Sequence, residues 1–128
     1  MKDYAKVVMC FDFGTKKIGI CVGETVTGAS QLLHIVYNDK NLLLNLKKIF
    51  DEWRPDLCIV GIPPKPKDNF NIAVKDFIQN IEKSFKVAVI TSNETLSSQL
   101  VPKNISANLK DSFSAKIIFE GWFNSRDE

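Results

Sequence analysis

The sequence predicts a single α/β domain in which a mixed five-stranded sheet is flanked by helices. Continuous apolar runs, such as Val7–Phe13, are typical of strands that are buried on both faces. From about residue 41 onward, such runs alternate with segments whose apolar residues recur at helical spacing. The chain has 128 residues, 45% of them hydrophobic and 25% charged, which fits one domain over residues 1–128 with a core of its own.

The first third of the chain predicts an antiparallel start to the sheet. Val7–Phe13 is the strand that we expect at the centre, and Gly14–Lys17 links it to a second strand at Ile18–Val22. A short glycine-bearing linker between two apolar runs indicates a hairpin. Gly28–Val36 is expected to supply a third strand.

The middle of the chain alternates between helix and strand. The apolar residues of the first predicted helix recur at helical spacing: Leu42, Leu43, Leu46, Phe50 and Trp53. Asn41 is a candidate N-cap for this helix, and Pro55 ends it. A short buried strand is expected at Leu57–Ile62, followed by a proline-rich loop.

The remainder predicts a second helix, a strand and a closing helix. The second helix is marked by Phe70, Ala73, Phe77, Ile78, Ile81 and Phe85. We expect a strand at Val87–Ile90, a short helical segment at Leu96–Val101, and a last helix over Asp111–Phe123. The main order, β-β-β-α-β-α-β-α, with right-handed crossovers between parallel strands, is that of a ribonuclease H-like fold.

Cysteine and histidine usage argues against a zinc site. The chain has one His, and Cys10, Cys21 and Cys58 all lie in apolar runs without the close spacing of zinc ligands. Buried free cysteines fit a reducing compartment, and the sequence shows neither a signal peptide nor a membrane span. We therefore expect a cytoplasmic protein with no membrane partner. The net charge of +2 allows nucleic-acid binding through a local basic patch without requiring it.

Three carboxylates stand at the ends of predicted elements. Asp12 ends the central strand, Glu94 follows the last strand, and Asp111 starts the last helix. Each has a structural alternative: a hydrogen-bonded turn, a favourable interaction with a helix dipole, and an N-cap, respectively. Brought together at one edge of a sheet, the three would be catalytic, metal-binding residues for Mg²⁺ or Mn²⁺. Two such ions can activate a water for phosphodiester hydrolysis.

The stretch Phe11–Gly23 closely resembles the opening motif of the YqgF/RuvX family, which is described both as Holliday junction resolvases and as pre-16S ribosomal RNA nucleases. Further matches follow in order along the chain: Thr27–Ala29, Trp53–Asp56, Ile59–Pro63, Asn93–Ser98 and Asp111–Ala115. The resemblance implies a ribonuclease H-like fold, divalent-metal-dependent hydrolysis of phosphodiester bonds and a bacterial cytoplasmic setting. It places the family's acidic triad at Asp12, Glu94 and Asp111.

The implied partner is nucleic acid, with the 5′ end of pre-16S ribosomal RNA preferred over a four-way DNA junction. Lys16, in the opening motif, and Lys110, before the last acid, are the candidate nucleic-acid-binding residues. The chain departs from the family at Asn93 and Thr95, where Asp and Arg are usual, and in a shorter spacing between the last two acids. A catalytically weakened nucleic-acid-binding module therefore stays an alternative, and the assembly is expected to be a monomer or a homodimer.

A second enzyme class shares this fold. Residues 12–16 (Asp-Phe-Gly-Thr-Lys) also resemble the phosphate-binding hairpin of sugar kinases and heat-shock ATPases. Those enzymes close two such domains around ATP and need more than twice this chain length, so the nuclease prediction is preferred. Divalent-metal binding that disappears when Asp12 is replaced would separate a nuclease from a pure binding module.

Overall fold

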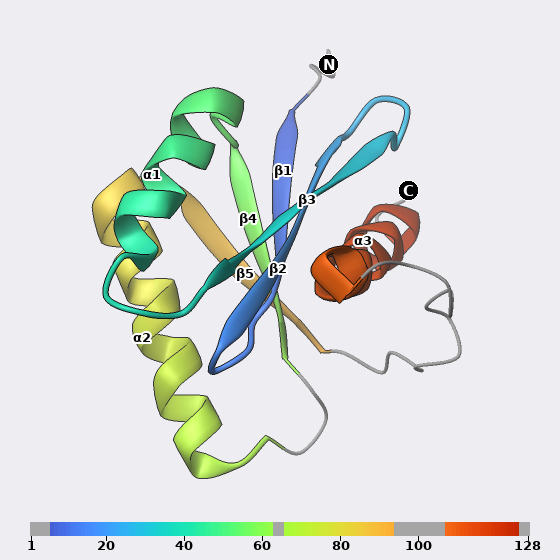
Figure 1. Cartoon of the computed structure of the whole chain (residues 1–128). Helices are drawn as coiled ribbons and strands as arrows, with labels where there is room; N and C mark the ends of the chain where they lie inside the picture. The colour runs from blue at the N-terminus through green and yellow to red at the C-terminus, as the bar shows by residue number, and fades with distance from the viewer. Residues whose placement is uncertain (1–5, 63–65, 94–106, 126–128) are drawn as a thin grey trace.

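The computed structural model describes residues 6–62, 66–93 and 107–125 and shows the expected sheet between helices (Figure 1). The strands are β1 (Val7–Asp12), β2 (Lys17–Glu24), β3 (Ser30–Tyr37), β4 (Leu57–Ile62) and β5 (Ala88–Asn93). The helices are α1 (Leu42–Trp53), α2 (Asp68–Phe85) and α3 (Ala107–Ser125). The predicted order of the main elements and the five-stranded sheet are confirmed.

The sheet has the strand order β3-β2-β1-β4-β5, with β1 at its centre. The pairs β1–β2 and β2–β3 are antiparallel, whereas β1–β4 and β4–β5 are parallel. Helices α1 and α2 cover one face of the sheet, and α3 covers the other (Figure 1). This is a ribonuclease H-like arrangement, in which the carboxyl ends of β1, β4 and β5 meet at one edge.

Alternation along β1 decides which side chains face which helices. Phe11 and Phe13 lie in the core under α1 and α2, where their ring centroids are 5.3 and 4.9 Å from that of Phe77 in α2. Val8 and Cys10 lie in the second core, which is closed by α3. Because successive strand residues point to opposite faces, the position between Phe11 and Phe13 belongs to the α3 face.

Some element ends differ from those expected. Helix α3 begins at Ala107, so Asp111 lies inside the helix, and the N-cap alternative for Asp111 is wrong. Asn41 precedes α1, but its side chain makes no capping hydrogen bond because its backbone (φ −96°, ψ 7°) is not in the extended region that N-caps use. Helix α2 already begins at Asp68. The predicted helical segment Leu96–Val101 lies outside the described residues.

The cysteines are free and buried, as expected from the apolar runs that contain them. Burial raises the pKa of the Cys21 thiol to about 11 and that of Cys58 to about 12, and it raises the pKa of Cys10 well above its ordinary value. These thiols are therefore core residues rather than nucleophiles. Within the described ranges, no helix is both long and apolar enough to cross a membrane.

Candidate active site

Asp12 ends β1 at the sheet edge where the parallel strands finish. In the sheet register it lies opposite Gly19 of β2 on one side and Gly61 of β4 on the other, and Gly61 pairs with Ser92 of β5. Because it lies between Phe11 and Phe13, its side chain belongs to the α3 face. Both neighbours of Asp12 in this row are glycines, so neither adjacent strand places a side chain beside its carboxylate.

Gly19 lets α3 approach the sheet directly beside Asp12. A Cβ atom at this glycine would lie 2.0 Å from the carbonyl oxygen of Asp111 and 2.6 Å from the backbone nitrogen of Ser112. Glycine inside a strand often marks such a close approach of another backbone. The contact places the backbone of Asp111 against the strand position opposite Asp12, so the structure brings together the elements that carry two of the three predicted acids.

Ser112 fixes the start of α3 to the sheet. Its hydroxyl accepts a hydrogen bond from the backbone N–H of Ile20 in β2 (3.0 Å) and donates one to the carbonyl of Leu33 in β3 (2.5 Å). Ile20 and Leu33 are register partners, and the β2–β3 register shifts between Ile18 and Ile20. A helix side chain therefore bridges two strands at a β-bulge, and Asp111 is held immediately beside this bridge.

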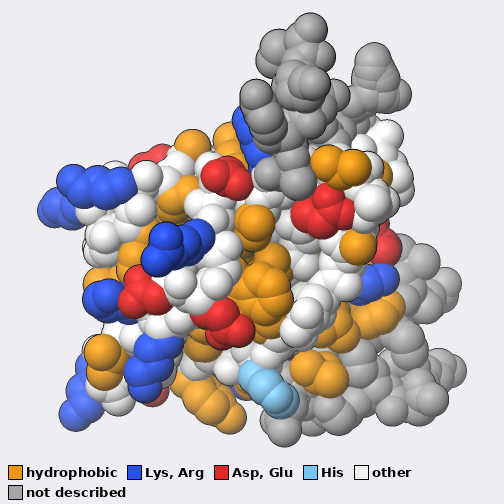
Figure 2. Space-filling model, turned by 90° about the horizontal axis from the view of Figure 1, so that it is seen from above, with side chains coloured by type: hydrophobic (Ala, Val, Ile, Leu, Met, Phe, Trp, Pro, Cys, Tyr) orange, Lys and Arg blue, Asp and Glu red, His pale blue; other side chains and the backbone are white. Residues whose placement is uncertain are grey.

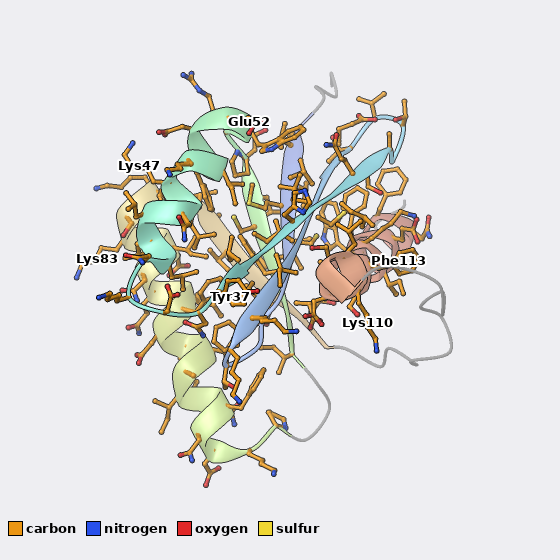
Figure 3. All side chains as sticks on the ribbon, in the orientation of Figure 1. Tyr37, Lys47, Glu52, Lys83, Lys110 and Phe113 are labelled. Atoms are coloured by element: carbon orange, nitrogen blue, oxygen red, sulfur yellow. The ribbon has the colours of Figure 1, made fainter. Side chains whose placement is uncertain are left out.

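One lysine of β2, Lys17, lies beside Asp111, and the two candidate nucleic-acid-binding lysines lie close to the acids along the chain. Lys17 Nζ lies 4.0 Å from Asp111 Oδ2, with both side chains partly exposed. Lys16, in the linker before β2, accepts a hydrogen bond at its carbonyl from the amide of Asn38, which holds the linker against the end of β3. Lys110 is exposed at the start of α3 (Figure 3). Lys110 thus lies on the helix that carries Asp111, and Lys16 lies in the linker that follows the strand carrying Asp12.

Glu94, the third predicted acid, lies outside the described residues, which in this region end with Asn93, the last residue of β5. Within the described part of the chain, no group of three or more His, Cys, Asp or Glu side chains could hold a metal ion. The two acids that are described offer carboxylate oxygens, the donor type preferred by Mg²⁺ and Mn²⁺. Their chemistry fits such a cation, whereas the buried thiols do not take part.

A groove of about 630 Å³ lies elsewhere, on the face covered by α1 and α2. It is lined by Leu43, Leu44, Lys47, Phe50, Asp51, Arg54, Pro55, Ser84 and Phe85. Figure 2 views the molecule from the end at which β1 begins; there, Lys and Arg side chains gather on the side of α1 and α2 with Asp and Glu among them. The groove contains none of the predicted site residues. We therefore place the active site at the edge of the sheet where Asp12 and Asp111 lie, which we call the carboxylate edge.

Comparison with known proteins identifies the family. Residues 6–125 match the family model RuvX, described as "Holliday junction resolvase". The chain belongs to the RuvX family. A relative from Blochmanniella floridana is 33% identical over 137 residues, covering 94% of this chain and 96% of its own length. One from Vibrio vulnificus (strain YJ016) is 34% identical, covering 95% and 98%. Both are named "Putative pre-16S rRNA nuclease", and membership of the RuvX family places this chain among the nucleases.

Solved structures confirm the fold. A fowlpox virus resolvase in complex with Holliday junction DNA aligns with a TM-score of 0.63 at 15% identity, covering 95% of this chain and 99% of that one. RuvC of T. thermophilus with a Holliday junction substrate aligns with a TM-score of 0.62 at 14% identity, covering 94% and 97%. At this level of identity, the likeness concerns the fold.

Sequence reasoning missed the residues that dock α3. Gly19 appeared only as part of a motif, although a glycine inside an apolar strand is a signal of close backbone approach. Ser112 carried no signal, because a serine in a helix gives no indication of which strands it will reach. Lys17 was expected only as the end of the linker between the first two strands, and its proximity to Asp111 depends on the docking of α3.

Proposed function

We propose that this chain acts as a single domain in the bacterial cytoplasm and is a divalent-metal-dependent nuclease that processes the 5′ end of pre-16S ribosomal RNA. The observation that carries the proposal is the close contact of Gly19 with the backbone of Asp111, directly across the β1–β2 ladder from Asp12. The relatives named for pre-16S ribosomal RNA match along nearly their whole length, which supports RNA as the substrate.

In the proposed mechanism, the acids bind the metal ions and the lysines contact the nucleic acid. Asp12, Asp111 and Glu94 would hold the cations through carboxylate oxygens. Bound in a pair, Mg²⁺ or Mn²⁺ would supply an activated water and stabilise the leaving oxygen of a phosphodiester. Lys17, beside Asp111, offsets part of the negative charge, and Lys16 and Lys110 would contact backbone phosphates.

The test is cleavage of a labelled pre-16S 5′ fragment in Mg²⁺ or Mn²⁺. We expect cleavage by the native protein and its loss in Asp12→Asn with an unchanged circular dichroism spectrum. Asp51→Asn is the matched control, because Asp51 is an exposed aspartate of α1 that pairs with Lys47 and lies away from the carboxylate edge. Cleavage that persists in Asp12→Asn, or that is lost equally in Asp51→Asn, would contradict the assignment.

A second substrate has its own support. The RuvX family description and the two structural neighbours name Holliday junctions, so a four-way DNA junction belongs in the same assay. A junction resolvase is expected to dimerise, since its substrate has two-fold symmetry. Cleavage of the junction by a dimer, without cleavage of the RNA, would replace the ribosomal RNA proposal. Metal-dependent binding of either nucleic acid without cleavage would instead favour the binding-module alternative.

A further inference from the structure

We propose that Tyr37 is a stacking platform for an unpaired base next to the carboxylate edge, and that the enzyme therefore acts on nucleic acid with a single-stranded segment beside the scissile phosphate. The proposal rests on the nuclease function above and deepens it. Six large hydrophobic side chains are exposed within the described ranges, and Tyr37, at 58% exposure, is the aromatic one among them.

The position of Tyr37 follows from the sheet register. It is the last residue of β3 and lies opposite Lys17, the lysine whose Nζ is 4.0 Å from Asp111. The preceding residue, Val36, is buried in the core under α1 and α2, so alternation puts the Tyr37 side chain on the α3 face. The ring, Lys17 and both described acids therefore share one face at one end of the sheet.

The spacing is suitable for a short run of nucleotides. Gly19 lies two residues beyond Lys17 in β2, and Asp12 is opposite Gly19. With strands about 4.8 Å apart and a rise of about 3.4 Å per residue, the backbones of Tyr37 and Asp12 are about 12 Å apart. A base stacked on the ring would thus lie close to a phosphate held at the carboxylates, and Lys17, which lies opposite Tyr37 and beside Asp111, would contact the nucleic-acid backbone between them.

The chemistry favours an unpaired base. β3 is the outer strand of the described sheet, and the Tyr37 side chain at its end is more than half exposed. In a duplex, both faces of each base are stacked on neighbouring pairs, whereas a splayed base can stack on an aromatic ring. Such stacking tolerates any base and is worth about 1–3 kcal/mol, a factor of about 5 to 150 in affinity.

The experiment measures binding in Mg²⁺ by fluorescence anisotropy, with Asp12→Asn as the parent so that the probe stays intact. The probes are a labelled 12-nucleotide single-stranded RNA, the same sequence as DNA, and the RNA in a blunt duplex. We expect the additional change Tyr37→Ala to weaken binding of the single-stranded probes about 5- to 150-fold. Tyr37→Phe should restore it, and duplex affinity should change less than about twofold.

Leu44→Ala is the control, because Leu44 is equally exposed, at 59%, but lies on α1. A 2-aminopurine base in the RNA gives a second readout: its fluorescence should be quenched by the parent and by Tyr37→Phe but not by Tyr37→Ala. Equal weakening of duplex and single strand, or unchanged single-strand binding in Tyr37→Ala, would overturn the proposal. Loss of RNA binding alone, or of DNA binding alone, would support it and name the substrate. If the native protein cleaves nothing, the nuclease function fails, while these binding data still decide the role of Tyr37.

Discussion

Replacing Ser112 by alanine should destabilise the protein, because its hydroxyl bridges Ile20 of β2 and Leu33 of β3. Ser112 is fully buried, so its removal leaves the Ile20 amide unsatisfied, at a cost of about 1–3 kcal/mol. The Leu33 carbonyl is only partly buried and adds a smaller amount. We therefore expect the free energy of unfolding to fall by about 2–4 kcal/mol.

Urea denaturation followed by circular dichroism measures this loss. With a slope of about 2 kcal/mol per M, the middle of the range for small proteins in urea, the midpoint should fall by about 1–2 M. Ser114→Ala is the matched control, because Ser114 is also a buried serine of α3. Both substitutions raise the helix propensity by the same amount, but only Ser112→Ala removes the bridge to β2 and β3. A loss below about 0.5 kcal/mol in Ser112→Ala, or an equal loss in Ser114→Ala, would refute the assigned role of the bridge.

Two further predictions use other sites. Gly19→Ala should cost about 1–3 kcal/mol of stability or more and reduce cleavage, because its methyl would collide with the Asp111 backbone and displace α3. Gly121→Ala should instead stabilise α3 by up to about 1 kcal/mol, because a Cβ at this position would meet no atom within 4 Å. Thermal unfolding measures both variants, and equal melting temperatures would contradict the packing argument. Because burial raises the pKa of all three thiols, a thiol reagent at pH 8 should label none of Cys10, Cys21 and Cys58 in the folded protein and all of them in urea. Rapid labelling of the native state would show that the core opens at these strands.

The parts of the fold that the sequence predicted are those set by local pattern. The apolar run at Val7–Phe13 is the central strand because it is buried on both faces, and Asp12 stands out as a polar residue at its end. The apolar residues at helical spacing before Pro55 predicted a helix that ends near this proline, and α1 ends at Trp53. The strand expected at Val87–Ile90 extends to Asn93, since Thr91, Ser92 and Asn93 continue the pairing with β4 although they are polar.

The parts that sequence reasoning missed depend on contacts between distant segments. Asp111 looked like an N-cap because nothing in the residues before it shows helical periodicity, yet α3 begins at Ala107. The docking of α3 produces the contact of Gly19 with Asp111 and the bridge at Ser112. The register between β2 and β3 places Tyr37 opposite Lys17. No local propensity encodes these positions.

The bridge at Ser112 gives the molecule a built-in reporter. In an ordinary ladder, a strand amide is protected from solvent hydrogen exchange by the neighbouring strand, and it exchanges when the sheet opens. The Ile20 amide donates to a side chain of α3 instead. Its exchange rate therefore follows departure of the helix, even while β1, β2 and β4 stay paired. One backbone proton would thus show how often the element carrying Asp111 leaves the sheet.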